Sequence, residues 1–535
     1  MTLTQAAVRA GAPVAAILAG ALAAVAFPPW GLMFGLFGWS LLFVLVDAQE
    51  GRGRVGRAFR LAWLAGTTYF LIGCWWVAEA FQVFPEVAWM APFAALLLGA
   101  GLGLFWGAAA AAYRRVAPAG TRRAVVFAAI LAMLEWLRGH VLTGFPWNLP
   151  GEAWLAGTPI SQLAAWIGAY GLTFVTIAAF AAFGLLVRPG SWKHRAGVAI
   201  AAAVVLAGAW IAGSVRLMQA EVRPTRTVVR VVQPDVNQKD KWTKAEFQRI
   251  VTRYVNLTAR PGDLDPTVVV WPEGALPIAF EDLGETGVEE AVAGALKPGQ
   301  VLLMGSIRSE VGKGGARRYY NSLHALVRDG EHLKPVAVYD KHRLVPFGEY
   351  MPGGALIPSL GIKALSNWSE GFDHGPRPRP IALPGMGQVQ PLICYESLFP
   401  GLAGNGPRRP DWIVNISNDA WFGRTSGPIQ HLNLASYRAI EQGLPIVRAT
   451  PTGVSAVIDP WGRVLRDARL NPGASGAIDS HLPEPAGRTI YAAFGDLPFA
   501  LLIALGLAFL IRRPGLRENN STSEENAVDQ TREGE

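Results

Sequence analysis

The residues best suited to chemistry are a cysteine, a glutamate and a lysine, each placed directly after a short apolar run. Cys394 follows VQPLI, Glu273 follows TVVVWP and Lys341 follows PVAVYD. A thiolate is a strong nucleophile, although a free thiol is only partly ionised at neutral pH. A nearby carboxylate can take its proton during attack, and an ammonium group can stabilise the oxyanion formed on the attacked carbonyl. The three residues predict covalent catalysis with Cys394 as nucleophile.

Each of these residues also has an ordinary structural interpretation. The only other cysteine, Cys74, lies in an apolar segment, so a structural disulfide is not expected. A single thiol in a folded domain is most often a small buried side chain, and it is the set of three that favours reactivity. We expect burial to raise the pKa of Glu273, which would make it a better base. We expect the backbone N–H of Tyr395 to be a second oxyanion donor.

The elements around these residues predict an α/β domain. Short β-branched runs recur along residues 227–480, and stretches such as 244–260 and 287–297 between them can form helices. Fully apolar strands that alternate with helices indicate buried sheets covered by helices. Functional groups in such folds gather at the carboxyl ends of the strands, where Glu273, Lys341 and Cys394 are placed.

The N-terminal part of the chain predicts a membrane domain. The 535 residues are 51% hydrophobic and only 16% charged, whereas a soluble chain carries about 25% charge. A helical span needs about 20 mostly apolar residues. The first candidate resembles a signal peptide in part, and we favour a retained helix. The candidate spans are 11–28, 31–48, 61–83, 87–112, 124–141, 159–187, 196–215 and 493–511.

Basic residues set the orientation of these spans. The loops 49–60, 113–123 and 188–195 and the segment after the last span are rich in arginine, whereas the alternate loops carry no lysine or arginine. The positive-inside rule puts the basic loops in the cytoplasm. The α/β domain therefore faces outward, which in a bacterium is the periplasm. Because the net charge of +8 resides largely in these loops, it does not indicate a nucleic-acid partner.

The predicted organisation has four parts. They are a transmembrane domain of about seven helices (1–216), a periplasmic catalytic domain (217–488), a final transmembrane helix (489–513) and a disordered cytoplasmic tail (514–535). The tail is too polar to bury a core.

Several features near the predicted membrane surface keep two interpretations. The aromatic side chains Trp30, Phe145, Trp147 and Trp154 fit an interfacial belt, and the FPWNLPG segment also fits a lipid entrance. Glu135 and Arg138, three residues apart on a predicted helix, can simply pair or can be functional. The apolar, Gly/Pro-rich segment 348–368 fits a packed loop or a mobile lid that contacts the membrane.

Three ordered motifs resemble the nitrilase superfamily of carbon–nitrogen hydrolases. They are WPEGALP, YDKHRLVPFGEYMP and LICYESLFP, and the later segments NISNDAWFG and TGVSAVIDPWGRVL fit the same pattern. The resemblance covers about residues 227–480 and implies an αββα sandwich. It implies that Glu273 is the base, Lys341 the oxyanion stabiliser, Cys394 the nucleophile and Glu349 a supporting carboxylate. For Glu396, a carboxylate at a helix N-terminus and a direct role both stay open.

Together with the spans and the segment EWLRGHVLTGFPWN, the architecture resembles the apolipoprotein N-acyltransferase family of the bacterial inner membrane. The resemblance implies acyl transfer from a phospholipid to the α-amine of a diacylglyceryl-cysteine lipoprotein through a thioester on Cys394. It implies no metal and no organic cofactor, and we expect a monomer. His342, His374 and His431 lack metal-ligand spacing, and Asp419 is interpreted as structural.

Two other functions fit parts of the sequence. A membrane-tethered amidohydrolase acting on a small amide would share the three residues but use water in the second step. A transporter or a binding protein with an inactive nitrilase-like domain would not need Glu273, Lys341 and Cys394 together, and its spans would be expected to carry charged midplane residues.

Overall fold

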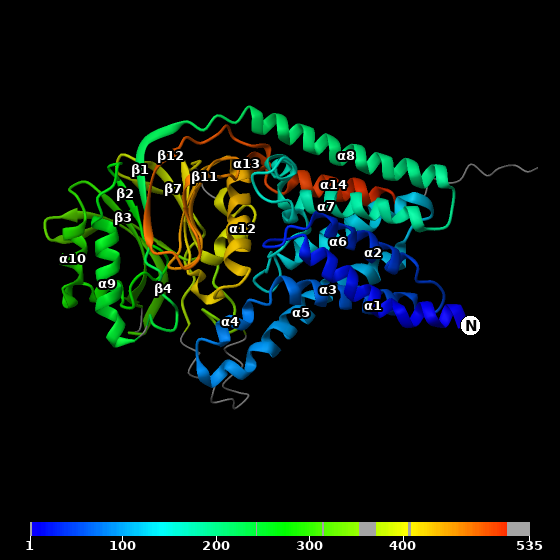
Figure 1. Cartoon of the computed structure of the whole chain (residues 1–535), viewed down its shortest axis with the longest axis horizontal. Coiled ribbons are helices and arrows are strands. Elements are labelled where there is room, and N and C mark those ends of the chain that lie inside the picture. The colour runs from blue at the N-terminus through cyan, green and yellow to red at the C-terminus, as the bar shows by residue number, and fades with distance from the viewer. Residues whose placement is uncertain (1–2, 242, 313–314, 353–370, 405–407, 511–535) are drawn as a thin grey trace, which may run out of the picture.

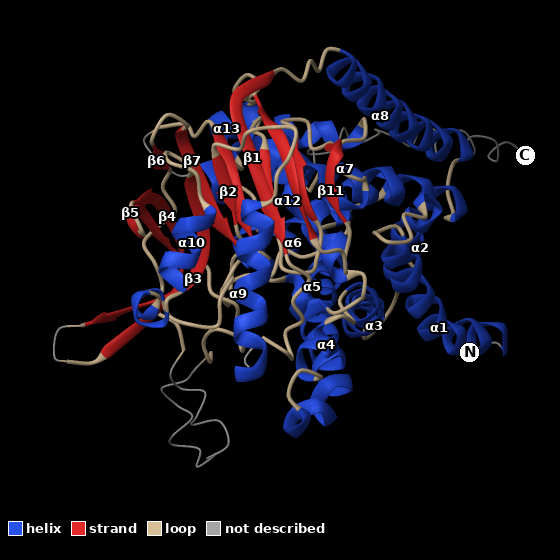
Figure 2. Ribbon diagram, turned by 60° about the vertical axis from the view of Figure 1, so that its left-hand side comes forward, coloured by secondary structure: helices blue, strands red, loops and turns tan. Residues whose placement is uncertain are grey.

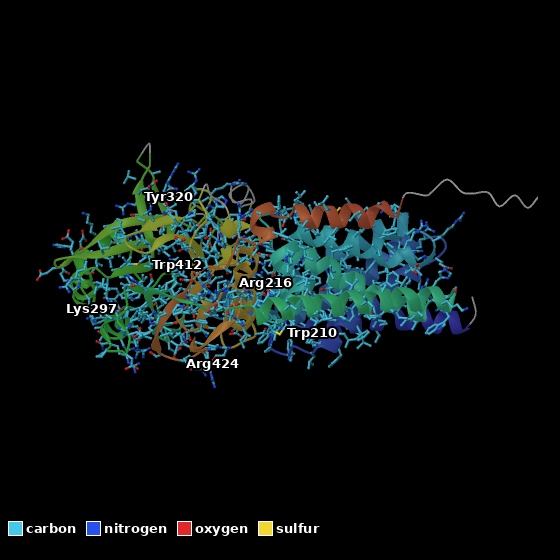
Figure 3. All side chains as sticks on the ribbon, turned by 90° about the horizontal axis from the view of Figure 1, so that it is seen from above. Trp210, Arg216, Lys297, Tyr320, Trp412 and Arg424 are labelled. Carbon is cyan, nitrogen blue, oxygen red and sulfur yellow. The ribbon has the colours of Figure 1, made fainter. Side chains whose placement is uncertain are left out.

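The computed structural model of the chain describes residues 3–510 apart from 242, 313–314, 353–370 and 405–407. Figure 1 shows a bundle of helices on one side and two sheets with their own helices on the other, and Figure 3 shows the same two parts from above. The predicted tail 514–535 and most of the predicted lid 348–368 lie outside the described residues.

Apolar helices build the first part, and each predicted span overlaps at least one of them. Three helical stretches are long and apolar enough to cross a membrane, namely Pro85–Val116, Ile160–Val187 and Trp192–Met218 among the described residues. The helices are α1 (Leu3–Val25), α2 (Phe37–Asp47), α3 (Arg54–Gly73), α4 (Val77–Phe81), α5 (Ala91–Val116), α6 (Arg123–Arg138), α7 (Ala164–Gly184), α8 (Trp192–Met218), α13 (Ile490–Phe494) and α14 (Leu497–Ala508).

The largest difference from the predicted spans is at α3. This helix begins at Arg54, inside the predicted basic loop, and ends at Gly73, before the predicted end at 83. Arginine is a good helix former, so the basic residues extend the helix instead of ending it. Cys74 then leaves the helical conformation, and α4 follows as a separate short helix.

Two six-stranded mixed sheets form the α/β domain. Their strand orders are β12-β1-β2-β3-β4-β5 and β11-β10-β9-β8-β7-β6. The first sheet contains β1 (Pro224–Gln233), β2 (Val268–Val270), β3 (Val301–Val311), β4 (Arg317–Asp329), β5 (His332–Asp340) and β12 (Gly476–Pro483). The second contains β6 (Ile381–Leu383), β7 (Gly387–Ile393), β8 (Trp412–Ile416), β9 (Ile446–Ala449), β10 (Ser455–Ile458) and β11 (Val464–Leu470). In each sheet three successive strands, β1-β2-β3 and β7-β8-β9, run parallel.

The two sheets pack against each other and are covered by helices on their outer faces. Apolar side chains from both sheets, such as Val270 and Val414, meet in one buried core. The helices α9 (Lys244–Ala259) and α10 (Val288–Ala295) cover the first sheet, as Figure 2 shows. Helix α12 (Gly427–Gln442) covers the second. The predicted αββα sandwich is confirmed.

Helix α12 also joins the sandwich to the membrane-type helices. Nearly all of its residues are buried, and one apolar cluster runs from α1 to α7 through α12 to the second sheet. The Gln430 amide donates to the carbonyl of Pro28 (3.0 Å). Its oxygen accepts from the indole N–H groups of Trp76 and Trp147, at 3.2 and 2.9 Å. The α/β domain is therefore joined to the helices by polar contacts inside an apolar interface.

Candidate active site

Three strand ends bring the predicted catalytic residues together. Glu273 follows β2, Lys341 directly follows β5 and Cys394 directly follows β7. The first two belong to one sheet and Cys394 to the other, so the site lies between the sheets. All three are buried, and Lys341 is 1% exposed.

Two carboxylates share the ammonium group of Lys341. Its Nζ lies 3.1 Å from Oε1 of Glu273 and 2.9 Å from Oε1 of Glu349. The side-chain amide of Asn321, on β4, donates to the same two oxygens at 2.6 and 2.7 Å. A hydrogen bond with Cys394 also lowers the pKa of the Glu273 carboxyl, whose other oxygen, Oε2, has no further hydrogen-bond partner within the described part of the chain. It is therefore the oxygen available to the Cys394 thiol.

These neighbours fix the resting charges of the three groups. Burial would raise the pKa of Glu273, but Lys341 and Asn321 outweigh burial and lower the pKa below its ordinary value. Burial would lower the pKa of Lys341, but Glu273 and Glu349 raise it. Burial, with the charge of Glu273, raises the pKa of the Cys394 thiol to about 12. The resting site thus holds a carboxylate, an ammonium and a neutral thiol.

The predicted direction of the Glu273 shift was wrong. We expected burial in an apolar cleft to raise this pKa, but the site supplies a cation and an amide within hydrogen-bond distance. Hydrogen bonds and an opposite charge favour the ionised form more than burial disfavours it. Glu273 is consequently always ready to accept a proton near neutral pH, although it is a weaker base than expected.

Cys394 has a left-handed backbone, with φ of +50°. A residue with a Cβ adopts this conformation at a cost of about 1 kcal/mol, so its surroundings must hold it. The carbonyl of Cys394 accepts from Ser397 Oγ (2.9 Å) and lies 3.2 Å from His431 Nε2. His431 Nδ1 in turn lies 2.9 Å from Asp419, which pairs with Arg448 at 2.8 Å. His431 and Asp419 therefore brace the nucleophile's backbone.

Glu396 is held by donors on two segments. Its Oε1 accepts from Tyr339 Oη at 2.8 Å and from the backbone N–H groups of His342 and Arg343, at 2.8 and 3.1 Å. Its Oε2 accepts the N–H of Ile393 at 2.8 Å. A carboxylate has about four acceptor positions, so these four hydrogen bonds use most of its accepting capacity. The contacts favour a positioning role, in which Glu396 fixes the Lys341 segment relative to the Cys394 turn.

Tyr395 connects the site to the helical part. Its hydroxyl donates to the carbonyl of Gly144 (2.5 Å), in the loop that follows α6. That loop is held by Arg138, which donates to the carbonyl of Trp147 (3.2 Å) and pairs with Glu135 (2.5 Å). The predicted pairing of Glu135 and Arg138 is confirmed. The loop after α6 therefore lies directly against the residue that follows Cys394.

Comparison with known proteins decides the family. The model of the apolipoprotein N-acyltransferase N-terminal domain matches residues 19–183, and the carbon-nitrogen hydrolase model matches residues 228–484. An apolipoprotein N-acyltransferase of Caulobacter vibrioides is 48% identical over 92% of this chain and 93% of that protein. The chain belongs to the apolipoprotein N-acyltransferase family.

More distant members of this family agree. The apolipoprotein N-acyltransferases of Rhodopseudomonas palustris and Bradyrhizobium diazoefficiens are 38% and 40% identical, over 94% and 93% of this chain and 95% and 94% of those proteins. An amidase structure from a Nesterenkonia species covers 52% of this chain and 97% of that chain with 18% identity and a TM-score of 0.35. A likeness that distant says nothing about activity.

Two polar residues near Glu273, Lys341 and Cys394 were not predicted from the sequence. Asn321 lies within β4, where the only signal is a polar residue at a buried strand position. Lys241 is 6% exposed, and burial lowers its pKa to about 8 against the opposing charge of Glu273. Its signal was a lysine in the polar segment QPDVNQKDK after β1.

Other aromatic and polar residues lie outside the reactive cluster. Trp147 is buried at 1% exposure, so it does not belong to an exposed aromatic belt, whereas Trp30 is 42% exposed. Asn415 contacts Arg448, and the Asn418 amide donates to Gln238 (2.9 Å). These hydrogen bonds tie the end of β8 to the segments around it.

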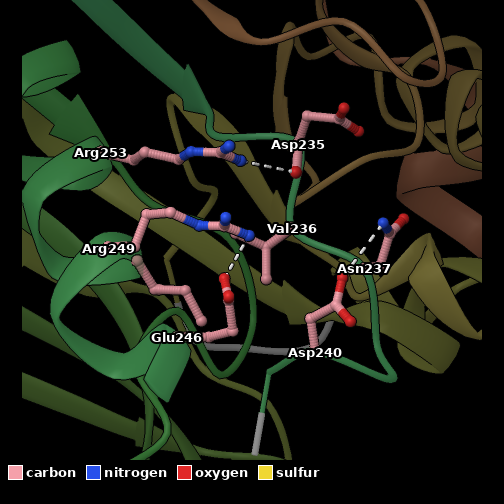
Figure 4. Close-up of a pocket in the computed structure, with 8 residues that line it drawn as sticks. Asp235, Val236, Asn237, Asp240, Glu246, Arg249 and Arg253 are labelled. Carbon is pink, nitrogen blue, oxygen red and sulfur yellow. Dashed lines mark hydrogen bonds and ion pairs between the residues drawn. The ribbon is translucent and has the colours of Figure 1, made fainter. Parts of the chain in front are cut away.

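A charged surface pocket lies between β1 and α9, as Figure 4 shows. None of its lining residues belongs to the triad. Arg249 pairs with Glu246, and Arg253 donates to the carbonyl of Asp235 (3.1 Å). Because this pocket shares no lining residue with the site of Glu273, Lys341 and Cys394, it is not assigned to the reaction of the family.

Proposed function

We propose that Cys394 takes a fatty acyl chain from a membrane phospholipid as a thioester and passes it to the N-terminal α-amine of a diacylglyceryl-cysteine lipoprotein. Membership of the family makes the chain an acyltransferase of lipoprotein biosynthesis. The observation that carries the assignment to Cys394 is the convergence of Glu273, Lys341 and Cys394 on one buried site.

In the first half-reaction, the sulfur attacks an ester carbonyl of the phospholipid. The thiol proton passes to Oε2 of Glu273 as the C–S bond forms, because a preformed thiolate is not stable in this site. The carbonyl oxygen becomes an oxyanion, which Lys341 and the N–H of Tyr395 stabilise. The C–O bond then breaks, and the proton held by Glu273 passes to the departing lysophospholipid alkoxide.

In the second half-reaction, the neutral amine of the lipoprotein attacks the thioester carbonyl. Glu273 takes a proton from the nitrogen, and the C–S bond breaks. The thiol regains a proton from Glu273, and the N-acylated lipoprotein leaves. No step requires a metal or an organic cofactor, since proton transfer and oxyanion stabilisation are supplied by side chains.

The same proposal places the protein as a monomer in the bacterial inner membrane. The basic loops then face the cytoplasm and the α/β domain faces the periplasm. The contact of Tyr395 with Gly144 supports this placement, because it puts the nucleophile beside a loop that ends a membrane helix. Both lipid-anchored substrates would reach Cys394 by lateral diffusion.

The test is direct trapping of the acyl-enzyme. The purified full-length protein is incubated with a phospholipid that carries a labelled acyl chain, and the intact protein is analysed by mass spectrometry. We expect one hydroxylamine-sensitive acyl group, absent in Cys394→Ala and retained in the control Cys74→Ala, which removes the other buried thiol. The acyl group should persist in buffer and leave when a lipopeptide amine is added. An acyl group on Cys394→Ala would refute the assignment, and rapid release of free fatty acid without amine would favour a hydrolase.

A further inference from the structure

A second pocket lies where the helical part meets the α/β domain, at the C-terminal end of α8. Arg216, on the last turn of α8, marks its position at this boundary (Figure 3). It is lined by two arginines, two tryptophans and short stretches around them: Trp166, Arg216, Gln219, Trp461 and the segment 486–490. The pocket is separate from the triad, since none of the three catalytic residues lines it.

The lining of this pocket carries positive charge without a counter-charge. Arg216 and Arg488 line it, and no carboxylate is found among its described lining residues. Nη2 of Arg216 is buried and has no hydrogen-bond partner in the described chain. Arg488 is exposed, and Arg409 is near enough that Arg488 adds to burial in lowering the pKa of Arg409. A buried guanidinium nitrogen without a partner is costly, so this arrangement favours a bound anion.

Neighbouring groups hold Arg216 in place. Its Nε donates to Oε1 of Gln162 (3.2 Å), and the amide of Gln162 donates to the carbonyl of Trp461 (2.9 Å). The guanidinium lies 5.9 Å from the centre of the Trp166 ring. One turn earlier, a Cβ at Gly213 would lie 1.7 Å from the carbonyl oxygen of Pro159, so the helix packs tightly there. These contacts therefore hold the Arg216 side chain in place beside the pocket before any ligand binds.

The surface beside the pocket is apolar. On α8, Trp210, Ile211 and Val215 are 55%, 56% and 41% exposed, and Ile490 of the pocket wall is 47% exposed. Exposed apolar side chains on a helix long enough to cross a membrane face lipid, and tryptophans gather at the level of the headgroups. Arg216 and Arg488 thus line a pocket that borders an exposed apolar surface, as expected for a site at the headgroup level of a bilayer.

We propose that this pocket binds the phosphate of an anionic phospholipid headgroup from the leaflet on the side of the α/β domain. Basic pockets between membrane helices are a known way to hold such headgroups. The occupant would be a bound lipid at the joint between α8 and the segment before α13, distinct from the acyl donor at Cys394. The proposal does not rest on the catalytic assignment, because it needs only that α8 lies in a bilayer.

The test measures lipid bound to the delipidated full-length protein by native mass spectrometry. Phosphatidylglycerol is titrated against phosphatidylcholine, and inorganic phosphate is added as competitor. An arginine near a membrane surface contributes a factor of about five in lipid affinity. We therefore expect phosphatidylglycerol to bind about fivefold more weakly to Arg216→Gln and to Arg488→Gln, and about 25-fold more weakly to the double variant. Arg216→Lys, which keeps the charge, should retain most of the affinity.

Arg424→Gln is the matched control, because it removes one exposed positive charge from the α/β domain outside the pocket. Its affinity for phosphatidylglycerol should equal that of the unaltered protein. Thermal unfolding without added lipid identifies any variant that fails to fold, and the exposed Arg488 provides a variant that tests the site even if Arg216→Gln is unstable. Equal binding by the Arg488→Gln variant and the control would overturn the proposal. Displacement of the lipid by millimolar phosphate would also overturn it, since the site would then take a free anion.

Discussion

Replacing Asn321 with leucine should shift the acid limb of the pH–rate profile for thioester formation to higher pH. The amide donates to the oxygens of Glu273 and Glu349 that also contact Lys341, and it is one of the groups that lower the pKa of Glu273. Leucine has a similar size and cannot donate. The pKa of Glu273 should therefore rise, because its ionised form loses a hydrogen bond while burial is unchanged.

The size of the shift is set by the bond that is lost. A hydrogen bond to a charged group contributes about 1.5–3 kcal/mol, and about 1.4 kcal/mol corresponds to one pKa unit. The pKa of Glu273 should thus rise by about one to two units. Because only the ionised form accepts the thiol proton, the rate of thioester formation should begin to fall at a pH that is higher by the same amount.

The assay is single-turnover formation of the acyl-enzyme from a labelled phospholipid between about pH 4 and pH 9, the range in which carboxylates and amines titrate. The control is Ser322→Ala, since Ser322 is the next residue on β4 and its hydroxyl bonds to Asp340 at 2.6 Å, away from the triad. The control should keep the pH profile of the unaltered protein. If the acid limb of the Asn321→Leu variant lies at an unchanged or lower pH, the amide does not stabilise ionised Glu273. This conclusion holds whatever the change in the maximal rate.

Four further outcomes are expected. Glu349→Gln should shift the acid limb of the pH–rate profile to lower pH and slow thioester formation by about tenfold or more. Lys341 would then pair with Glu273 alone, which makes Glu273 a weaker base. A shift of the acid limb to higher pH would contradict this. Glu396→Gln should lower the free energy of unfolding by about 2–4 kcal/mol in thermal or denaturant melts, since an amide NH2 would face backbone donors. Tyr395→Phe should slow acyl transfer from vesicle phospholipid by about fivefold, because it removes one hydrogen bond that contributes about 1 kcal/mol. An unchanged rate would mean that the contact with Gly144 has no part in the reaction. Transfer to the amine should rise with pH up to about 8, where an α-amine loses its proton, while thioester formation stays level there because the thiol pKa is about 12.

The sequence predicts well that Glu273, Lys341 and Cys394 each follow a strand. The strand residues just before Glu273 and Cys394 are buried, whereas most of β5, before Lys341, is not. Apolar runs such as TVVVW and VQPLI have one plausible secondary structure, and the residues directly after a parallel strand lie at the sheet's carboxyl edge. The helix predicted at 244–260 is also found, as α9, because its apolar side chains recur at helical spacing.

Contacts between distant segments could not be predicted in this way. Asn321 reaches Glu273 only because β4 pairs with β3 in a particular register, in which it lies opposite Ile307. Tyr395 reaches Gly144 across 251 residues of sequence. The direction of the Glu273 pKa shift depends on distances of about 3 Å to Lys341 and Asn321, which no spacing along the chain reveals.

The opposite pH shifts expected for Asn321→Leu and Glu349→Gln both test the same arrangement of charges around Lys341. The resting cluster of Glu273, Glu349 and Lys341 carries one net negative charge. When Glu273 accepts the thiol proton, that charge moves to the substrate oxyanion, and Lys341 needs a remaining carboxylate to stay ionised in a buried site. Glu349 provides it, while Asn321 offers a hydrogen bond without charge and so stabilises the resting carboxylates. Removing the amide should therefore strengthen the base, and removing the second carboxylate should weaken it. Shifts in the same direction would mean that the two residues act on Glu273 through packing and not through charge.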